Sequence, residues 1–576
     1  MPRSVRTTSR KPKLGLALSG GGFRASFFHI GVLARLAELD LLRSVEVIST
    51  VSGGSIIGAL YFLYLKKLLE CIPDMRITGA DYVKMIDEMT HLFVAGVRKN
   101  PRVLAFSNIA SNFKLVLPSY SRSDRMSEIY HELFYDPASG RRNIPMRDLI
   151  IRPHPGQGFN PRVDNAGRKA KVPMLIINAT TLNTGRTFQF TAVDMGERFP
   201  ERQTLKYDKN PVLQAFRYDA LPEGVPSKYK DVPLGIAVAA SACVPGVFHP
   251  LALTKLYKKF TPQLVDGGVH DNQGLEALLY EGCTDIIVSD ASGQMDKKAN
   301  PWPNFLAVTL RANSILQNRV RNLGLEFLQA YAGIRQPILH LRAGLNVDVM
   351  KPGTSPTESR ESVNNEQKRE WGEVAGVRDN YGIPVEIQLA LSKIRTDLDA
   401  FSDVEAQSLI FNGYRITEKD IVPEFVAKFA TNNNAKTKRM KSAAHGFDEI
   451  VPLETGTKKS QSYKDQLASA KDVLFKIFND LPAVPKWTMR ILTGALWAVL
   501  AFAVCYGSYR IPYGLVFLLE YLHKLYWLWQ TLFVVIIGTA FLMILVPILI
   551  SFIAMAHLVL VNPVFLRRGK IDAIAD

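Results

Sequence analysis

Three short segments of this sequence combine glycines with a side chain that could take part in ester chemistry. They are Ser19–Ala25 (SGGGFRA), Thr50–Ser55 (TVSGGS) and Leu264–Gly268 (LVDGG). A serine hydroxyl can attack an ester carbonyl when a base removes its proton, and glycine N–H groups can hold the oxyanion that forms. The three segments therefore pose the question of whether they form one acyl-transfer site.

Ser52 follows the β-branched run Val45–Val51 and precedes an apolar stretch that starts at Ile56. A strand, a serine, small residues and a buried helix make up a nucleophile elbow, in which the serine sits on a strained turn. We predict Ser52 as the nucleophile, with the N–H of Gly53 as one oxyanion donor. Thr50 stands where the G-x-S-x-G pattern has glycine, so the match is imperfect, and a tight connection without chemistry is the alternative.

The base for Ser52 could be a histidine or an aspartate. His29, His249 and His270 are candidates, but each also fits a helix face, a turn or a loop. Asp266 stands between a short apolar run and two glycines, where a turn could leave its side chain free. Its reference pKa of about 3.9 is low for a base at neutral pH, and burial beside a serine would raise it. Asp266 is the better candidate, although Asp-Gly-Gly by itself is also an ordinary turn.

The first glycine segment allows two chemical interpretations, and a tight turn that packs the helix closely on the strand is the structural alternative. Gly20, Gly21 and Gly22 could point backbone N–H groups at a developing oxyanion. The spacing from Gly20 to Ala25 also fits a loose dinucleotide fingerprint, with Glu46 about twenty residues further on. That match is weak because Glu46 lies near the start of its strand, whereas a ribose-binding acid belongs at the strand's end.

The elements around these segments predict an α/β fold. Residues 14–18 and 45–51 are typical of buried strands, and each precedes a helical pattern, so a parallel sheet covered by helices is expected. Further strands are predicted at 174–179, 187–191 and 285–289, with a turn at 183–185. Residues from about 66 to 165 indicate a mostly helical and irregular insertion.

Together and in this order, the three segments resemble the patatin-like phospholipase family. Asn178–Phe190 (NATTLNTGRTFQF) and Ala237–Pro250 (AVAASACVPGVFHP) resemble it too, and the resemblance covers roughly residues 13–345. It implies a three-layer α/β/α sandwich and a Ser–Asp dyad without histidine. The dyad would be Ser52 and Asp266, with an oxyanion hole made by Gly20, Gly21, Gly22 and Gly53. Arg24 matches the family's arginine after the glycines and would brace the loop or meet a lipid phosphate, with a structural ion pair as the alternative.

The C-terminal block is different in kind. Residues 491–509 carry no charge over 19 positions, and none occurs from Leu525 to Leu566. About 20 apolar residues span a bilayer, so we expect one span at 491–509, a second from about Trp527 to Ile550, and then an interfacial or re-entrant helix. A buried hairpin of a soluble domain is the alternative.

The net charge of +17 is concentrated near the chain ends and beside the apolar block. Basic flanks fit the positive-inside rule and an anionic membrane surface. The four scattered cysteines indicate a reducing compartment, and no apolar run precedes Leu14 as a secretory signal would require. We expect an integral membrane protein with its catalytic domain on the cytoplasmic side, and no nucleic-acid partner.

The expected organisation has five regions. They are a basic tail at 1–12, a hydrolase domain at 13–410 with a mobile loop at about 351–372, a basic linker at 411–485, membrane helices at 486–566 and a basic tail at 567–576. The function expected is a membrane-anchored lipid acyl hydrolase of the phospholipase or lysophospholipase type, acting on membrane phospholipid or another acyl-ester lipid. The sequence shows no calcium-binding loop and no metal site, and no cofactor is expected. The rivals are a catalytically inactive membrane adaptor of the same fold and a nicotinamide-binding protein that uses Gly20–Ala25.

Overall fold

The computed structural model describes residues 11–570 apart from several segments. The segments outside the description are 115–119, 157, 199–212, 246–247, 294–299, 302, 331–337, 341–382, 431–457 and 471–545. The loop expected at 351–372, the span expected at 491–509 and most of the span expected at 527–550 therefore lie outside the described residues.

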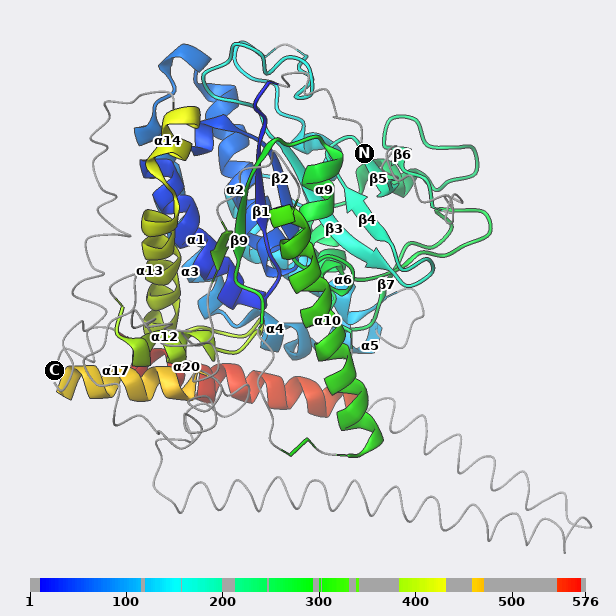
Figure 1. Cartoon of the computed structure of the whole chain (residues 1–576). Coiled ribbons are helices and arrows are strands. Elements are labelled where there is room, and N and C mark those ends of the chain that lie inside the picture. Colours follow the sequence, from blue (N-terminus) through cyan, green and yellow to red (C-terminus); the bar gives the residue numbers. More distant parts are fainter. Residues whose placement is uncertain are drawn as a thin grey trace, which may run out of the picture.

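A central mixed sheet organises the described part of the chain (Figure 1). Its strand order is β10-β9-β1-β2-β3-β4-β5-β6, and β8 pairs with both β3 and β7. The strands are β1 (Leu14–Leu18), β2 (Val45–Val51), β3 (Met174–Thr181), β4 (Thr187–Phe190), β5 (Asp194–Glu197), β6 (Phe216–Arg217), β7 (Leu251–Ala252), β8 (Gln263–Asp266), β9 (Asp285–Asp290) and β10 (Ile338–His340). The strands predicted at 14–18, 45–51, 174–179, 187–191 and 285–289 are confirmed.

The sheet is parallel only in part, which corrects the expectation of a parallel sheet. The strands from β10 through β9, β1 and β2 to β3 run parallel, whereas β4, β5, β6, β7 and β8 pair antiparallel. A short turn after Thr181 joins β3 to β4, and a connection of that length can join only antiparallel neighbours. The turn predicted at 183–185 lies within this connection.

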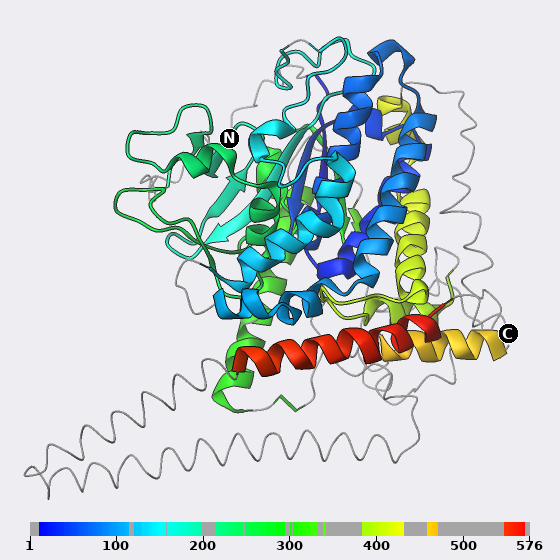
Figure 2. The ribbon, with the colours of Figure 1, turned by 180° about the vertical axis from the view of Figure 1, so that it is seen from behind.

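Helices cover both faces of the sheet (Figures 1 and 2). The larger core joins one face to α1, α2 and α3, and a smaller core joins the other face to α9 and the end of α10. Alternate residues of β1 serve the two sides, because Leu16 lies in the first core and Ala17 in the second. The helices on the sheet and in the insertion are α1 (Gly22–Glu38), α2 (Gly53–Cys71), α3 (Gly79–Arg98), α4 (Pro101–Ser107), α5 (Ile109–Lys114), α6 (Arg122–Tyr130), α7 (Asp136–Ser139), α8 (Leu234–Ser241), α9 (Leu275–Tyr280) and α10 (Phe305–Ala330).

The boundary expected at residue 410 falls inside a helix. The later helices are α12 (Val385–Ser392), α13 (Asp403–Asp420), α14 (Pro423–Phe429) and α17 (Lys458–Ser469). α13 packs lengthwise on α1, where Tyr414 donates its hydroxyl to Glu38 at 2.6 Å and Glu418 lies 3.7 Å from Arg35. The first part of the expected linker is therefore a layer of the domain.

One helix in the described residues, Val546–Arg568, is long and apolar enough to cross a membrane, with a mean hydropathy of 2.2. We call it the C-terminal helix; α20 (Asn562–Arg568) is its last part. Length and composition alone are weak evidence for a span, because the buried core helix of a soluble protein passes the same test. Figures 1 and 2 show it lying across the end of the domain.

Candidate active site

Ser52 occupies the turn between β2 and α2, at the carboxyl end of a buried strand. Its backbone has φ 50° and ψ −120°, which residues with a side chain rarely adopt, and the residue is 5% exposed. Such a conformation costs about 1–3 kcal/mol and persists only where the surrounding structure enforces it. This is the geometry of a nucleophile elbow.

The register of β3 places Asp266 beside Ser52. β2 pairs with the first part of β3 and ends with Val51 opposite Asn178. β8 runs antiparallel along the remainder of β3 and ends with Asp266 opposite Ala179. β4 occupies the other edge of β3, so β2 and β8 approach each other from opposite ends along one edge. The residues at their tips therefore meet.

The Asp266 carboxyl is buried, and its electrostatics suit a base. Burial raises the pKa of Asp266 to about 6, while the Ser52 hydroxyl and the Gly268 N–H act to lower it. Oδ1 accepts the Gly268 N–H at 2.8 Å, whereas Oδ2 has no hydrogen-bond partner in the described residues. The Ser52 hydroxyl therefore lies near the carboxylate without completing a hydrogen bond of standard geometry. An unpaired oxygen of this kind is available to accept a proton.

The glycine loop brings the N-terminus of α1 against the N-terminus of α2. α1 begins at Gly22 and α2 at Gly53, and neither end has a hydrogen bond from a capping side chain. A Cβ on Gly53 would lie 2.0 Å from the Gly22 carbonyl oxygen, so the two backbones touch. The first N–H groups of a helix have no acceptor within it and carry the positive end of the helix dipole. Two such ends beside Ser52 create a site for an anion.

The glycines expected as oxyanion donors are not equivalent. Gly20 lies close to the serine, because a Cβ on Gly20 would be 3.1 Å from Ser52 Cβ. Its N–H, however, is already donated to the Asn272 carbonyl at 3.0 Å. In the described part of the chain no acceptor is recorded for the N–H groups of Gly21, Gly22 or Gly53.

A buried set of hydroxyl groups supports the elbow from beneath. Ser241 Oγ accepts the Ser52 N–H at 2.9 Å and donates to the Asn178 carbonyl at 2.6 Å. Ser55 Oγ lies 2.8 Å from Ser241 Oγ and donates to Thr50 Oγ1 at 2.9 Å. The strained peptide at Ser52 is thus tied to β3 through Ser241.

Replacing Ser241 with alanine should slow ester hydrolysis and destabilise the fold by about 1–3 kcal/mol, because the buried Ser52 N–H loses its acceptor. Ser55→Ala is the matched control, since it removes a neighbouring hydroxyl but leaves the Ser52–Ser241 bond in place. Steady-state kinetics and urea unfolding of both variants check this. Equal loss of activity in the two variants would contradict a specific role for Ser241.

Thr50, which departs from the usual glycine, is accommodated by a glycine elsewhere. A Cβ on Gly58 of α2 would lie 2.6 Å from Thr50 Cγ2, so the threonine methyl occupies the space that Gly58 leaves open. The Thr50 hydroxyl donates to the Ile176 carbonyl at 3.1 Å. The helix can therefore approach the elbow closely despite the larger side chain.

Gly58→Ala should destabilise the protein by about 1–3 kcal/mol through overpacking against Thr50. Adding Thr50→Ser, which removes the methyl and keeps the hydroxyl, should recover most of that loss. Unfolding free energies of both single variants and the double variant measure the coupling. Simple additivity of the two effects would show that the contact does not explain the threonine.

Arg24 is buried at 3% exposure and faces backbone carbonyls. Its guanidinium donates to the carbonyls of Ala291 at 2.8 Å and Ile394 at 3.0 Å. Burial lowers the pKa of Arg24 to about 10. Of the two expected roles, this geometry fits bracing of the glycine loop rather than contact with a lipid phosphate.

Two of the three histidines considered as bases, His29 and His270, have other partners. His29 Nε2 lies 2.9 Å from the Ser19 carbonyl and Nδ1 2.6 Å from the Ser289 hydroxyl. Burial lowers the pKa of His29 to about 4. His270 lies 3.1 Å from Glu276 and 3.0 Å from the Gly185 carbonyl. Within the described ranges no histidine is hydrogen-bonded to Ser52, which leaves Asp266 as the candidate base.

Glu46 does not fit the dinucleotide alternative. β1 and β2 are parallel with Leu18 opposite Thr50, so the glycine loop follows the carboxyl ends of both strands. Glu46 is the second residue of β2, about 13 Å away along the strand at 3.3 Å per residue. An acid at the amino end of the strand cannot hold a ribose beside the glycine loop.

Several residues at this site received no role from the sequence. Asn178 and Ser241 support the elbow, and the Asn272 side chain lies between Gly20 and Gly268, since a Cβ on either glycine would come within 2.4 Å of its Oδ1. Polar residues inside apolar runs are the signal that could have found the first two, because buried polar groups need partners. Asn272 lies in a polar loop and carries no such signal.

Of three comparisons with known proteins, the family match is the informative one. The model of the patatin-like phospholipase family matches residues 16–279, which include Ser52, Asp266 and the glycine loop. A search of the curated proteins finds no match. Human GIVD cytosolic phospholipase A2, solved with a fluorophosphonate inhibitor, aligns at 14% identity and a TM-score of 0.37, covering 73% of this chain and 59% of that one.

VipD from Legionella pneumophila aligns at 12% identity and a TM-score of 0.22, covering 80% of this chain and 83% of that one. Both structural scores are too low to support an argument, and the match spans less than two thirds of the phospholipase. The family match carries the assignment instead. Residues 16–279 of this chain belong to the patatin-like phospholipase family.

Proposed function

We propose that this protein is a lipid acyl hydrolase in which Ser52 is the nucleophile and Asp266 the base. One observation carries the proposal: Ser52 stands on a strained turn, beside the unpaired carboxylate oxygen of Asp266 and two helix N-termini that no side chain caps. Nucleophile, base and oxyanion site are the three parts that acyl transfer requires.

In the first step Asp266 takes the Ser52 proton as Oγ attacks the ester carbonyl. The negative charge that forms on the carbonyl oxygen is held by the N–H groups of Gly21, Gly22 and Gly53. The tetrahedral intermediate collapses, the C–O bond to the alcohol breaks, and Asp266 returns the proton to the leaving oxygen. The products are a free alcohol, such as a lysophospholipid, and an acyl group on Ser52.

In the second step water replaces the alcohol. Asp266 removes a proton from the water, the hydroxide attacks the acyl carbonyl, and the same glycine N–H groups hold the second oxyanion. The C–O bond to Ser52 breaks, and Oγ recovers its proton from Asp266. A free fatty acid leaves, and the enzyme returns to its starting state.

The lipid substrate and the membrane location belong to this proposal. The family of residues 16–279 supports a lipid ester, and the C-terminal helix together with the uncharged segments before it supports a membrane-bound chain. The basic residues that flank the apolar block support a catalytic domain on the cytoplasmic side. Anchoring would keep the site at the surface in which its substrate is dissolved.

Fatty-acid release by the full-length protein in lipid vesicles tests the proposal. Vesicles containing phosphatidylcholine, lysophosphatidylcholine or diacylglycerol are compared, and release from at least one is expected. No release from any of them by a folded, vesicle-inserted protein would favour the inactive adaptor.

A further inference from the structure

The C-terminal helix turns its small and polar residues toward the domain. The buried positions recur at helical spacing along its length and into the residue after it, and they are Pro547, Ser551, Ala554, Asn562 and Gly569. A helix on the surface of a soluble protein normally does the reverse and buries its apolar face. What holds this helix to the domain is therefore polar contact and close approach.

Hydrogen bonds at three places hold the helix to the domain along its length. Near its start, Asn112 of α5 donates to Ser551 Oγ at 2.6 Å. Near its end, Asn562 donates to the Arg98 carbonyl at 3.0 Å and accepts from Asn100 at 3.3 Å. Beyond the last turn, the Gly569 carbonyl accepts the N–H of Val404 at 3.2 Å. Ser551 and Asn562 are about 16 Å apart at 1.5 Å per residue, so the helix lies lengthwise on the domain.

The opposite side of the helix is a row of large apolar side chains, which we call the outward face. Its members, each between 41% and 71% exposed, are Val546, Ile548, Leu549, Phe552, Ile553, Met555, Val559, Leu560 and Val564. α5 extends the same character, because Ile109 and Phe113 are 46% and 36% exposed on either side of the anchoring Asn112. Large exposed apolar side chains gathered on one side of a helix mark a contact with a membrane or a partner.

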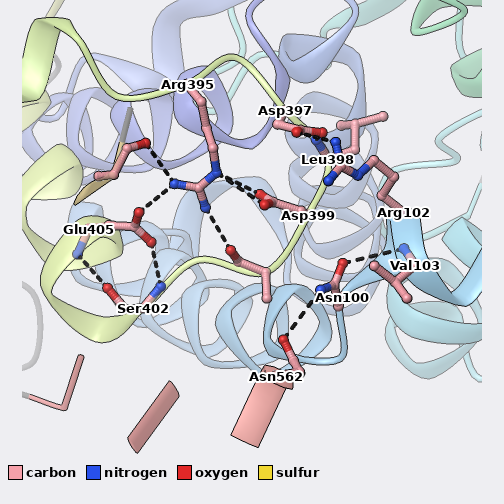
Figure 3. A network of polar contacts seen from close by, with 12 residues as sticks. Asn100, Arg102, Val103, Arg395, Asp397, Leu398, Asp399, Ser402, Glu405 and Asn562 are labelled. Carbon is pink, nitrogen blue, oxygen red and sulfur yellow. Dashed lines mark hydrogen bonds and ion pairs between the residues drawn. The ribbon is translucent and has the colours of Figure 1, made fainter. Parts of the chain in front are cut away.

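The helix lies at the active-site end of the domain. It meets Ser402 closely, since a Cβ on Gly569 would be 2.2 Å from Ser402 Cβ. The loop that ends at Ser402 also touches the oxyanion loop, because the Asp397 carbonyl accepts the Phe23 N–H at 2.9 Å. Figure 3 shows Asp397 and Ser402 of this loop, with Asn562 of the C-terminal helix hydrogen-bonded to Asn100 close by.

Ion pairs hold the loop between Arg395 and Ser402 in place. Arg102 of α4 is paired with Asp397, and its N–H is donated to the Leu398 carbonyl at 3.0 Å. Arg395 is buried between Asp399 and Glu405 (Figure 3). The C-terminal helix and the glycine loop therefore contact the same well-anchored loop near its two ends, at Ser402 and Asp397.

Two features select a lipid surface as the occupant of the outward face. The chain immediately before the helix has no formal charge from Leu525 onward, so it suits an apolar medium. Directly after the outward face come Arg567, Arg568 and Lys570, which suit anionic headgroups. A crossing of the bilayer fits poorly, because it would strip Ser551 and Asn562 of their partners and place both among acyl chains.

We propose that the C-terminal helix lies flat in the membrane interface, with its outward face in the lipid and its polar face still bound to the catalytic domain. The membrane-bound helix then fixes the orientation of the domain, with the carboxyl ends of β1 and β2 directed toward the bilayer. Only the consequence for catalysis rests on the proposed hydrolase function; the placement of the helix does not.

The first test is a disulfide cross-link in the full-length protein, reconstituted into vesicles of phosphatidylcholine and phosphatidylglycerol. Cys71 and Cys505 are first replaced with serine. Asn112→Cys with Ser551→Cys should cross-link under mild oxidation, because the two side chains touch. Asn112→Cys with Phe552→Cys is the matched control and should not, because Phe552 is 71% exposed on the outward face. Absence of the first cross-link in vesicles would show that the helix leaves the domain, and would overturn the proposal.

The second test measures the depth of spin labels on single cysteines at Leu549, Phe552, Val559 and Leu560 in the same vesicles. A flat helix predicts one shallow depth within the lipid for all four. A spanning helix predicts that the depth of the labels changes along the chain and is greatest near the middle of the helix. Labels exposed to water would show that the outward face is not in contact with lipid. Either of these results would overturn the proposal.

A third measurement separates this inference from the proposed function. Phe552→Glu should reduce hydrolysis of vesicle lipid by tenfold or more while leaving hydrolysis of a soluble short-chain ester unchanged. Equal rates of vesicle-lipid hydrolysis for wild type and variant would contradict the role of the helix in orienting the domain on the membrane. If the wild-type protein hydrolyses neither vesicle lipid nor the soluble ester, the result would instead count against the hydrolase function.

Discussion

Replacing Ser52 with glycine should abolish ester hydrolysis and at the same time stabilise the fold. The loss of the nucleophile should lower kcat/KM by roughly 10⁴-fold or more. The gain arises because Ser52 has φ 50°, which costs a residue with a Cβ about 1–3 kcal/mol and costs glycine almost nothing. Thermal and urea unfolding should show an increase of about 1 kcal/mol.

Ser52→Ala is the matched control for this prediction. Alanine removes the same hydroxyl but keeps the Cβ, so activity should vanish without the gain in stability. A glycine variant no more stable than the alanine variant would mean that the turn is not strained. Substantial hydrolysis by either variant would remove Ser52 from the mechanism.

Asp266→Asn should also remove activity and add stability, for a different reason. Asparagine cannot accept the Ser52 proton, so kcat should fall by roughly 10³–10⁴-fold. At pH 7 the wild-type carboxylate is ionised in a buried site, and its pKa is raised from 3.8 to about 6. The ionised form therefore costs the native state free energy, which the neutral amide avoids. We expect unfolding at pH 7 to cost about 1–3 kcal/mol more in the variant.

The pH dependence has a definite sign for this group. Because the pKa of Asp266 is higher in the folded state, its ionisation destabilises the protein as the pH rises from about 4 to about 6. The stability advantage of Asp266→Asn should therefore be full at pH 7 and nearly absent at pH 4. Wild-type kcat/KM should fall as the pH drops below about 6, because the base becomes protonated. A flat profile between pH 5 and 7 would contradict Asp266 as the base.

The strands and helices that carry the site could be predicted from the sequence because each has a clear local pattern. Val45–Val51 is a buried β-branched run, and the apolar stretch from Ile56 to Leu60 continues the helix that begins at Gly53. The elbow lies between them, so its position follows from its neighbours. The glycine loop after Leu18 is located in the same way.

The meeting of Ser52 with Asp266 could not be predicted from local pattern alone. It depends on β8 running antiparallel into the position that β2 leaves open beside β3, a pairing between segments more than 80 residues apart. The choice of Asp266 over a histidine likewise needed the resemblance to a family. Gly20 shows the same limit in detail, because its amide is engaged by Asn272 from a distant loop.

The C-terminal boundary of the catalytic domain could not be predicted from the sequence either. Residues 411–420 were expected to begin a basic linker, yet they continue α13, which packs lengthwise against α1. The sequence of the C-terminal helix shows that the helix is apolar, but it does not show which of its residues face the domain. That division depends on contacts with Asn112 and Arg98, which lie over 400 residues earlier in the chain.

The central claim is that Ser52 is an activated nucleophile, and covalent labelling by a fluorophosphonate tests it most directly. The full-length protein in vesicles is treated with the probe and digested, and the adduct is located by mass spectrometry. The account predicts one adduct, on the peptide that carries Ser52, formed in wild type and missing in Ser52→Ala. Labelling at another serine, or none in a folded wild-type protein that is inserted in the vesicles, would contradict it.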